Sequence, residues 1–227
     1  MSDRPLIVVR PEPGFATTLA AAREAGLAAY GQPLFRIEPV LWQAPPPSGY
    51  AGLLVGSANV FRHGGKQLAG LASLPVMAVG DTTAQAARDA GFVVTRTGNG
   101  GLDALAGTLP PGHYVRLAGE RHVALVLPEG VTVDTLIVYA ARPVAIAAPL
   151  AALLAAPCVV LLHSAEAARH VAHECDRIGI ARANVQLACL APRIAAAAGT
   201  GWHTVASAGR RDDAALLALA RQMCQTP

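Results

Sequence analysis

Three short stretches place hydroxyl side chains where a helix is expected to begin. Ser57, the pair Thr82 and Thr83, and Ser164 each follow an apolar run typical of a β-strand and each precede a helical pattern. N-capping is the ordinary role of such residues and accounts for their presence on its own. Helix N-termini at the carboxyl ends of parallel strands also present free N–H groups, which bind carboxylates or phosphates. The three stretches are therefore candidate anion-binding groups.

The histidines and cysteines do not predict a metal centre. His170 and His173 are three residues apart on an expected helix, and Glu166 shares their face. No further ligand closes this set, so a solvated helix face is the favoured interpretation. The 4 cysteines form no CxxC pair and are expected to be buried free thiols.

Composition narrows the class of partner. Of 227 residues, 53% are hydrophobic, 15% are charged and 4% are aromatic, and Lys66 is the single lysine. The arginines are scattered and not gathered in runs with interleaved aromatics, which argues against nucleic acid. The mild net charge of +3 favours a soluble anionic small molecule.

The cellular location is predicted from two sequence features, a membrane-spanning run and a signal peptide, neither of which is found. No apolar run reaches the roughly 18 residues of a membrane span, and the Ala-rich stretch 149–156 is expected to be a buried helix. The N-terminus lacks the basic start and long apolar core of a signal peptide. We therefore expect a cytoplasmic protein without membrane contact.

The elements that position these residues alternate between strand and helix. Leu6–Val9 reads as a strand, and a periodic segment over residues 15–25 reads as a helix that Gly26 closes. Further strand-like runs lie at residues 52–55, 76–79, 93–95, 113–117, 132–138, 158–162, 185–189 and 203–205. Short runs rich in Val and Leu suit parallel strands covered on both faces, so the fold class is α/β with parallel sheets covered by helices.

A weak internal duplication indicates two similar domains. Residues 53–59 resemble residues 160–166, and residues 76–84 resemble residues 187–195. Each pair keeps its order and leads through a helix to a glycine–aromatic step. Two similar α/β domains are the natural interpretation, with chance similarity between unrelated α/β units as the alternative.

The chain is expected to cross between the domains twice. No Gly/Ser-rich linker divides them, and the candidate crossings are the extended pieces 33–39 and 137–143. Two crossings mean that one domain is inserted into the other. We place domain 1 at residues 1–35 and 142–227, and domain 2, with the connector strands, at residues 36–141.

The order and spacing of these motifs resemble the uroporphyrinogen-III synthase family over nearly the whole chain. The matching stretches are VVRPEPG (8–14), LLVGSANV (53–60), AVGDTTA (78–84), VY (138–139) before RP (142–143), LLHSA (161–165) and CLAPRIA (189–195). Two positions depart from the family's pattern: His163 precedes Ser164, and Pro192-Arg193 stands where Thr or Ser is more familiar.

The resemblance implies a fold and a reaction. The fold has two α/β domains joined by a two-stranded connector, with domain 1 flavodoxin-like. The substrate is hydroxymethylbilane, a chain of four pyrroles with eight carboxylates. A hydro-lyase closes it to uroporphyrinogen III, inverting ring D through a spiro intermediate and losing water. This step serves heme, siroheme and cobalamin biosynthesis, needs no cofactor, and is expected of a monomer that meets the preceding pathway enzyme only transiently.

The resemblance also implies site residues. Tyr139 is the candidate acid, because a phenol with an ordinary pKa of about 10 stays protonated at neutral pH and can donate to the departing hydroxyl. The alternative for Tyr139 is an aromatic that packs a domain joint. The candidate substrate-binding residues are Arg10, Ser57, Asn59, Thr83, Gly119, Arg121, Ser164 and Arg193. For Arg10 and Arg121 a solvated surface charge is the alternative.

Two other functions remain open from the sequence. A two-domain sensor that binds a small anion without catalysis would share the fold. A nucleotide-dependent transferase would need a phosphate loop, and the glycine-rich run 98–101 lacks that spacing.

Overall fold

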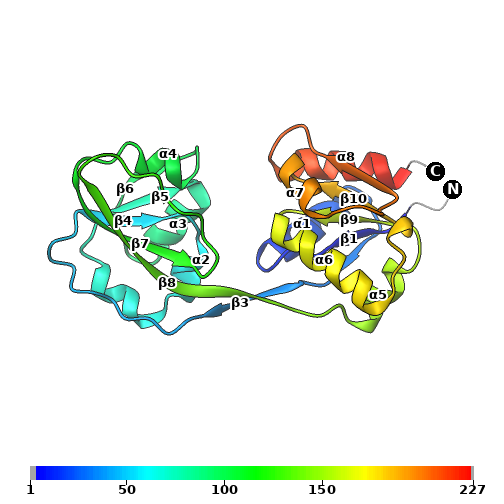
Figure 1. Cartoon of the computed structure of the whole chain (residues 1–227), viewed down its shortest axis with the longest axis horizontal. Helices are drawn as coiled ribbons and strands as arrows, with labels where there is room; N and C mark the ends of the chain where they lie inside the picture. The colour runs from blue at the N-terminus through cyan, green and yellow to red at the C-terminus, as the bar shows by residue number, and fades with distance from the viewer. Residues whose placement is uncertain (1–3, 226–227) are drawn as a thin grey trace. The chain divides into compact units, whose positions relative to one another are not determined.

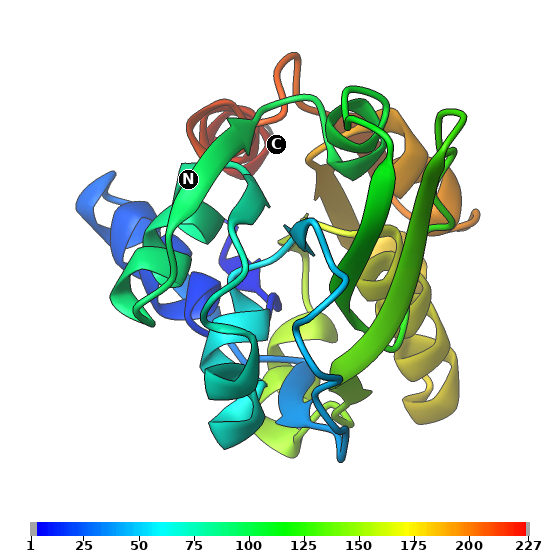
Figure 2. The same cartoon turned by 90° about the vertical axis from the view of Figure 1, so that its left-hand side faces the viewer.

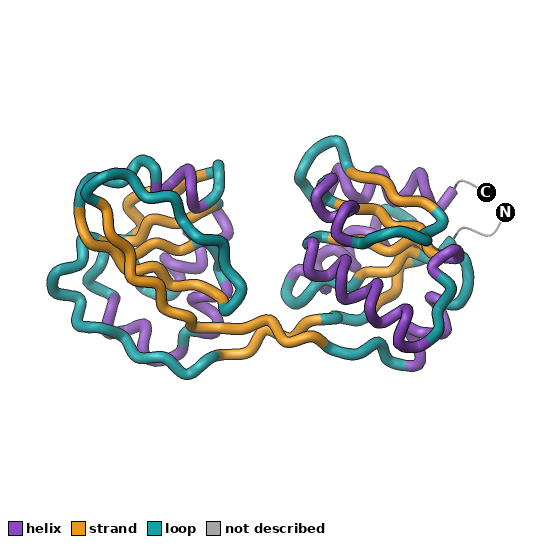
Figure 3. The backbone as a smooth tube through the Cα atoms, in the orientation of Figure 1, coloured by secondary structure: helices purple, strands orange, loops and turns teal. Residues whose placement is uncertain are grey.

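The computed structural model describes residues 4–225, which fall into two compact units. Unit 1 holds the described residues up to Arg36 and from Pro143 onward, and unit 2 holds Ile37–Arg142. The chain passes from one unit to the other twice, within β3 (Phe35–Pro39) and at the end of β8 (Val131–Pro143). Strands and helices alternate along most of the chain (Figure 1, Figure 3).

Unit 1 contains a five-stranded parallel sheet in the order β2-β1-β9-β10-β11. The strands are β1 (Leu6–Val8), β2 (Ala29–Gly31), β9 (Cys158–Leu162), β10 (Val185–Cys189) and β11 (Thr204–Ser207). Numbered within the unit, this is the order 2-1-3-4-5 of the flavodoxin-like doubly wound fold. The direction of winding therefore reverses between β1 and β9.

Helices cover the sheet of unit 1. They are α1 (Gly14–Glu24), α5 (Ala148–Leu154), α6 (Ala165–Ile178), α7 (Pro192–Ala197) and α8 (Asp213–Gln225), with a 3-10 turn at Arg182–Asn184. Residues of α1 and α8 share one apolar cluster with β1, β9 and β10, so these two helices cover the same face. In β9 and β10 every residue is buried, as expected for central parallel strands.

Unit 2 contains a six-stranded sheet in the order β3-β8-β7-β4-β5-β6, whose strands from β4 to β8 pair in parallel. Besides β3 and β8 it holds β4 (Gly52–Val55), β5 (Val76–Val79), β6 (Val94–Gly98) and β7 (Gly112–Gly119). Winding runs from β4 to β6 in one direction and resumes with β7 on the other side. The reversal in unit 2 therefore lies between β4 and β7.

The helices of unit 2 lie on both faces of its sheet (Figure 2). They are α2 (Asn59–His63), the 3-10 helix η1 (Gly65–Leu71), α3 (Asp81–Asp89) and α4 (Leu102–Ala106). One apolar cluster joins α2, η1 and α3 to the sheet, and another joins α4 and the loop after β7. Two mostly parallel sheets flanked by helices confirm the fold class that the sequence predicts.

Two details of the sequence prediction need correction. The Ala-rich stretch expected as a buried helix is α5, a surface helix of which only Leu150 and Leu154 are buried. Alanine favours helix whether or not it is buried, so a run of alanines does not report burial. The strand β2 was not predicted, because it has only three residues at a sheet edge and two of them are exposed.

Candidate active site

A pocket of about 250 Å³ lies at the reversal point of unit 2. In open α/β sheets, ligands bind beyond the carboxyl ends of the strands where the winding reverses. The residues that line the pocket come from the ends of β4 and β7, from α4, from the loop after β7 and from β8; they are Gly56, Ser57, Leu102, Asp103, Arg116, Leu117, Ala118, Gly119, Arg121, His122, Val123, Leu125 and Tyr139. The pocket thus brings together four of the residues predicted from the sequence: Ser57, Gly119, Arg121 and Tyr139.

Tyr139 lies half-buried on the wall of this pocket, opposite Gly119. The two residues are partners across β7 and β8 at a register shift, and the Glu120 amide donates to the Tyr139 carbonyl at 2.9 Å. A Cβ atom on Gly119 would lie 2.7 Å from Cε2 and Cζ of the Tyr139 ring. Residue 119 is therefore glycine because the ring occupies the space that a side chain would need.

Ser57 forms the start of the turn after β4. Its Oγ accepts from the Asn59 amide at 3.2 Å, so it stabilises the turn and is not the N-cap of α2, a position that Ala58 holds. Asn59 is the first residue of α2, and its Oδ1 accepts from Arg62 Nη1 at 3.4 Å. Asn59 does not line the pocket.

Arg116 and Asp103 were not predicted from the sequence. Arg116 is in the middle of β7 and only 6% exposed, and Asp103 is on α4. Burial lowers the pKa of Arg116, and the charge of Asp103 partly offsets this. The available signal was an arginine inside the apolar run 113–117. That run predicts a core strand, so its arginine was not considered as a site residue.

Thr83 lies apart from this pocket. It is only 5% exposed and belongs to the buried side of α3 with Ala84 and Ala87. The predicted capping by Thr82 and Thr83 is wrong, since Gly80 is the N-cap and no side chain caps this helix. A glycine with φ of 77° starts the helix there, so both threonines fall inside its first turn.

Unit 1 also places polar groups at its reversal point. Arg10, just after β1, donates from Nη1 to Asp213 Oδ2 at 2.6 Å and to Thr18 Oγ1 at 3.1 Å. His163, just after β9, is 8% exposed at its side chain, and its Nε2 lies 3.5 Å from Asp213 Oδ1. That separation is too long for a well-formed hydrogen bond, and neither ring nitrogen of His163 has a hydrogen-bond partner among the described residues. His163 and Arg10 together hold the pKa of Asp213 at about 2.

Ser164 and Arg193 sit at two further helix starts of unit 1. Ser164 is the N-cap of α6, and its Oγ accepts from the Ala167 amide at 3.1 Å, so the capping prediction is confirmed there. Arg193 is exposed in the first turn of α7, which Pro192 opens, and it forms no ion pair with the described residues. The predicted substrate-binding residues of unit 1 each follow a strand: Arg10 follows β1, Ser164 follows the neighbouring β9, and Arg193 follows β10.

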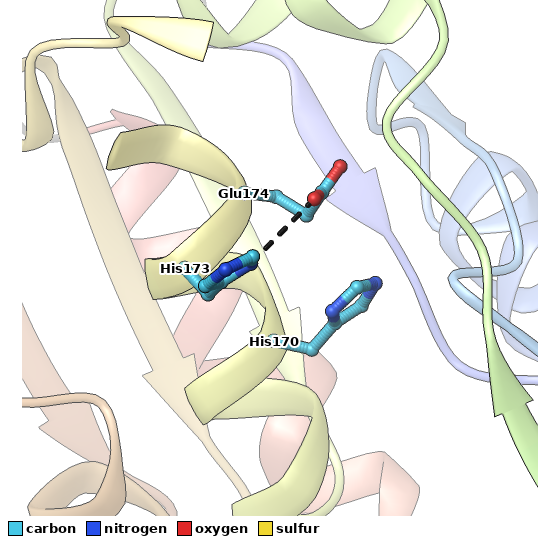
Figure 4. A group of neighbouring side chains, drawn as sticks. All are labelled: His170, His173 and Glu174. Atoms are coloured by element: carbon cyan, nitrogen blue, oxygen red, sulfur yellow. Dashed lines mark ion pairs between the residues drawn. The ribbon is translucent and has the colours of Figure 1, made fainter. Parts of the chain in front are cut away.

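The histidines set aside in the sequence group with Glu174, not with Glu166 (Figure 4). The carboxylate of Glu174 is fully engaged: it accepts two bonds of 2.7 Å from Arg177 and a third of 2.7 Å from the Ile146 amide. His170 contacts the Val144 carbonyl through Nε2 at 2.9 Å. These contacts fasten the segment after β8 to α6.

The cysteines are buried free thiols, as predicted. Burial raises the pKa of Cys158 to about 12 and that of Cys189 to about 11. These groups are inert thiols of the core, since the thiolate is the reactive form.

Two mostly parallel sheets, each with a reversal point and polar side chains beyond it, define a protein of the doubly wound α/β class. The family model described as uroporphyrinogen-III synthase HemD matches residues 16–218. The chain therefore belongs to the uroporphyrinogen-III synthase family, the cyclising lyases that convert hydroxymethylbilane into uroporphyrinogen III in tetrapyrrole biosynthesis.

Solved structures agree with this at the level of the fold. The uroporphyrinogen-III synthetase of Helicobacter pylori is 15% identical with a TM-score of 0.68, covering 97% of this chain and 99% of that one. A mutant synthase of Thermus thermophilus is 18% identical with a TM-score of 0.55, covering 98% and 100%. No curated protein matches the sequence. Among the described residues, no helix has the length and apolar character to cross a membrane.

Proposed function

We propose that the pocket of unit 2 holds the reacting end of hydroxymethylbilane and that Tyr139 assists the departure of its hydroxyl. The observation that supports this most directly is a half-buried phenol on the wall of a pocket at the strand-order reversal, with Gly119 leaving room for its ring. The phenol donates to the leaving oxygen as the carbon–oxygen bond breaks, and the hydroxyl departs as water.

The remaining steps need positioning more than acid or base. Loss of the hydroxyl leaves an azafulvene cation, which attacks the substituted carbon of the far ring and forms the spiro intermediate. That intermediate fragments and recloses with ring D inverted, and the proton released on closure restores the phenol of Tyr139. The linear substrate closes to the wrong isomer without an enzyme, so the enzyme must fold it and direct the attack. Positioning of this kind supplies up to roughly 7–11 kcal/mol.

We assign the substrate carboxylates to the polar groups at the strand ends. In unit 2 these are Ser57 and Arg121 in the pocket, with Asn59 in the adjoining turn. Thr83 is buried on α3, so we assign no carboxylate to it. In unit 1 the groups are Arg10, Ser164 and Arg193. An exposed arginine and a helix N-terminus both bind carboxylates, which supports this assignment.

We further propose that the chain works in the cytoplasm as a monomer and meets the preceding enzyme of the pathway transiently. The support is chemical: a substrate that closes spontaneously to the wrong isomer is best passed on quickly. Sedimentation of the free chain tests the first part, and a dimer at micromolar concentration contradicts it.

Product analysis tests the function itself. Purified protein is supplied with freshly made hydroxymethylbilane, and the isomers are separated after oxidation to porphyrins. We expect type III to predominate, while a heat-denatured control gives type I. If the native protein yields type I alone, the proposed function is wrong, and binding without turnover would instead indicate a sensor.

A further inference from the structure

Arg116 carries a buried positive charge that forms no ion pair with any residue in the described range 4–225. It lies in the middle of β7 between Leu54 of β4 and Thr135 of β8, and its side chain shares a face of the sheet with Tyr114. Its exposed fraction is 6%. A guanidinium stays charged in proteins, so burying it is costly unless it is paired and hydrogen-bonded.

Only one nitrogen of this guanidinium has a partner among the described residues. Nη1 donates to the Val123 carbonyl at 2.7 Å, in the loop after β7. Nε is sealed from solvent and has no hydrogen-bond partner. Asp103 acts on Arg116 through its charge, yet the two form no ion pair within the part of the chain described. Burying a donor without a hydrogen-bond partner destabilises the folded state.

The same side chain lines the pocket that holds Tyr139. Arg121 and His122 contribute further cationic or donor groups to its lining, and Asp103 is the one acid among the lining residues. The pocket is therefore cationic on balance, and the geometry of a guanidinium matches a carboxylate through two parallel N–H bonds. A carboxylate in this pocket would pair with the guanidinium of Arg116 and neutralise its charge.

We propose that Arg116 binds one carboxylate side chain of the substrate and thereby fixes which pyrrole lies against Tyr139. This inference rests on the proposed function and adds to it a residue that sets position and isomer specificity. The Val123 contact holds the guanidinium in place before the substrate arrives, which lowers the entropy cost of binding. Arg116 is a positioning residue in this scheme and takes no part in proton transfer.

The test compares three variants with the wild type. Arg116→Met replaces the charge with an apolar chain of similar length, and Arg116→Lys retains the charge without the fork. Arg96→Met is the matched control, because Arg96 also donates to a backbone carbonyl of unit 2, that of Thr108 at 3.0 Å, but does not line the pocket. Each is assayed for KM, kcat, isomer ratio and Tm.

We expect Arg116→Met to raise KM about tenfold or more and to increase the share of type I product, because the substrate loses its anchor. Its Tm should be unchanged or higher, since an unpaired buried charge is removed. Arg116→Lys should recover part of the KM, and Arg96→Met should match the wild type.

Two results would overturn the inference. Arg116→Met with wild-type KM and isomer ratio would remove Arg116 from substrate binding. A lowered Tm with unchanged kinetics would show that it only holds the loop after β7. Either result leaves the proposed function standing if the wild type forms type III, whereas type I from the wild type would reject the function itself.

Discussion

Replacing Gly119 by alanine tests the placement of Tyr139 without removing its phenol. The new Cβ would lie 2.7 Å from Cε2 and Cζ and 3.0 Å from Oη of the Tyr139 ring. Carbon atoms in contact are about 3.5–4.0 Å apart, so the ring must move by about 1 Å. The backbone at residue 119 is not in the left-handed region, so alanine adds no backbone strain. The perturbation is therefore confined to the position of the ring.

The size of the effect follows from what the phenol contributes. General acid help is typically worth about 10²–10⁴-fold, and a leaving group activated by the pyrrole nitrogen places Tyr139 at or below the low end. Tyr139→Phe should therefore lower kcat by roughly 10- to 100-fold with the fold intact. A shift of about 1 Å can cost as much as about 10²-fold, so Gly119→Ala should lower kcat to a similar level. Overpacking should also cost about 1–3 kcal/mol of stability.

A double-mutant cycle separates these contributions. If Gly119→Ala acts through the phenol, it should cost little more in the Tyr139→Phe background, so the two effects on kcat will not add. Gly70→Ala is the control, since its Cβ would meet only the Ala44 Cβ at 3.4 Å. Wild-type kcat and isomer ratio in a folded Gly119→Ala protein would refute the reasoning, because the ring would then have no required position.

Two further predictions concern charges of unit 1. The Arg177 hydrogen bonds lower the pKa of Glu174 from 4.5 to about 2, with a further contribution from the Ile146 amide. A carboxyl group whose pKa is lower in the folded state stabilises the protein fully above about pH 4.5 and loses this effect as the pH falls toward 2. Glu174→Gln should therefore lower the free energy of unfolding by on the order of 1–3 kcal/mol at pH 7. Its urea unfolding midpoint should also fall less than that of the wild type as the pH drops from about 5 to 2; the same fall in both proteins contradicts this. Arg193→Ala should raise KM more than it lowers kcat, with an effect that weakens at high salt and no change in Tm. Arg10→Ala should raise KM in the same way and also lower Tm, because Asp213 loses its cationic partner. Equal Tm for the two variants would count against the Arg10–Asp213 contact.

The central strands were predictable because burial makes their sequences unambiguous. The runs 52–55, 76–79, 158–162 and 185–189 match the structure to the residue, and nearly all their side chains are buried. Edge strands have a weaker apolar pattern. The predicted runs 93–95 and 203–205 each begin one residue before the observed strand, β6 or β11, and end before that strand ends. A strand that is covered on both faces needs apolar residues throughout, whereas an edge strand does not.

Pairing between distant residues was beyond the reach of the sequence. Asp213 is 203 residues from Arg10, and nothing in the pattern of either segment indicates the other. The same holds for Arg116, whose charge faces a loop and a helix that come together only in the fold. Local patterns predict which residues follow a strand. They do not predict which charged side chains come together where the strand order reverses.

The contrast between Gly119, at the end of β7, and Thr83 shows which site predictions a sequence supports. The carboxyl ends of parallel strands lie at the same edge of a sheet, so residues just beyond them gather whatever the exact strand end is. At a helix start an error of one residue turns the side chain by about 100°, because a turn holds about 3.6 residues. Gly80 caps α3 one residue before Asp81, and this places Thr83 on the buried side while Thr82 is exposed. Residues at strand ends, such as Gly119 at the end of β7 and Ser57 after β4, are therefore the firmer basis for mutagenesis.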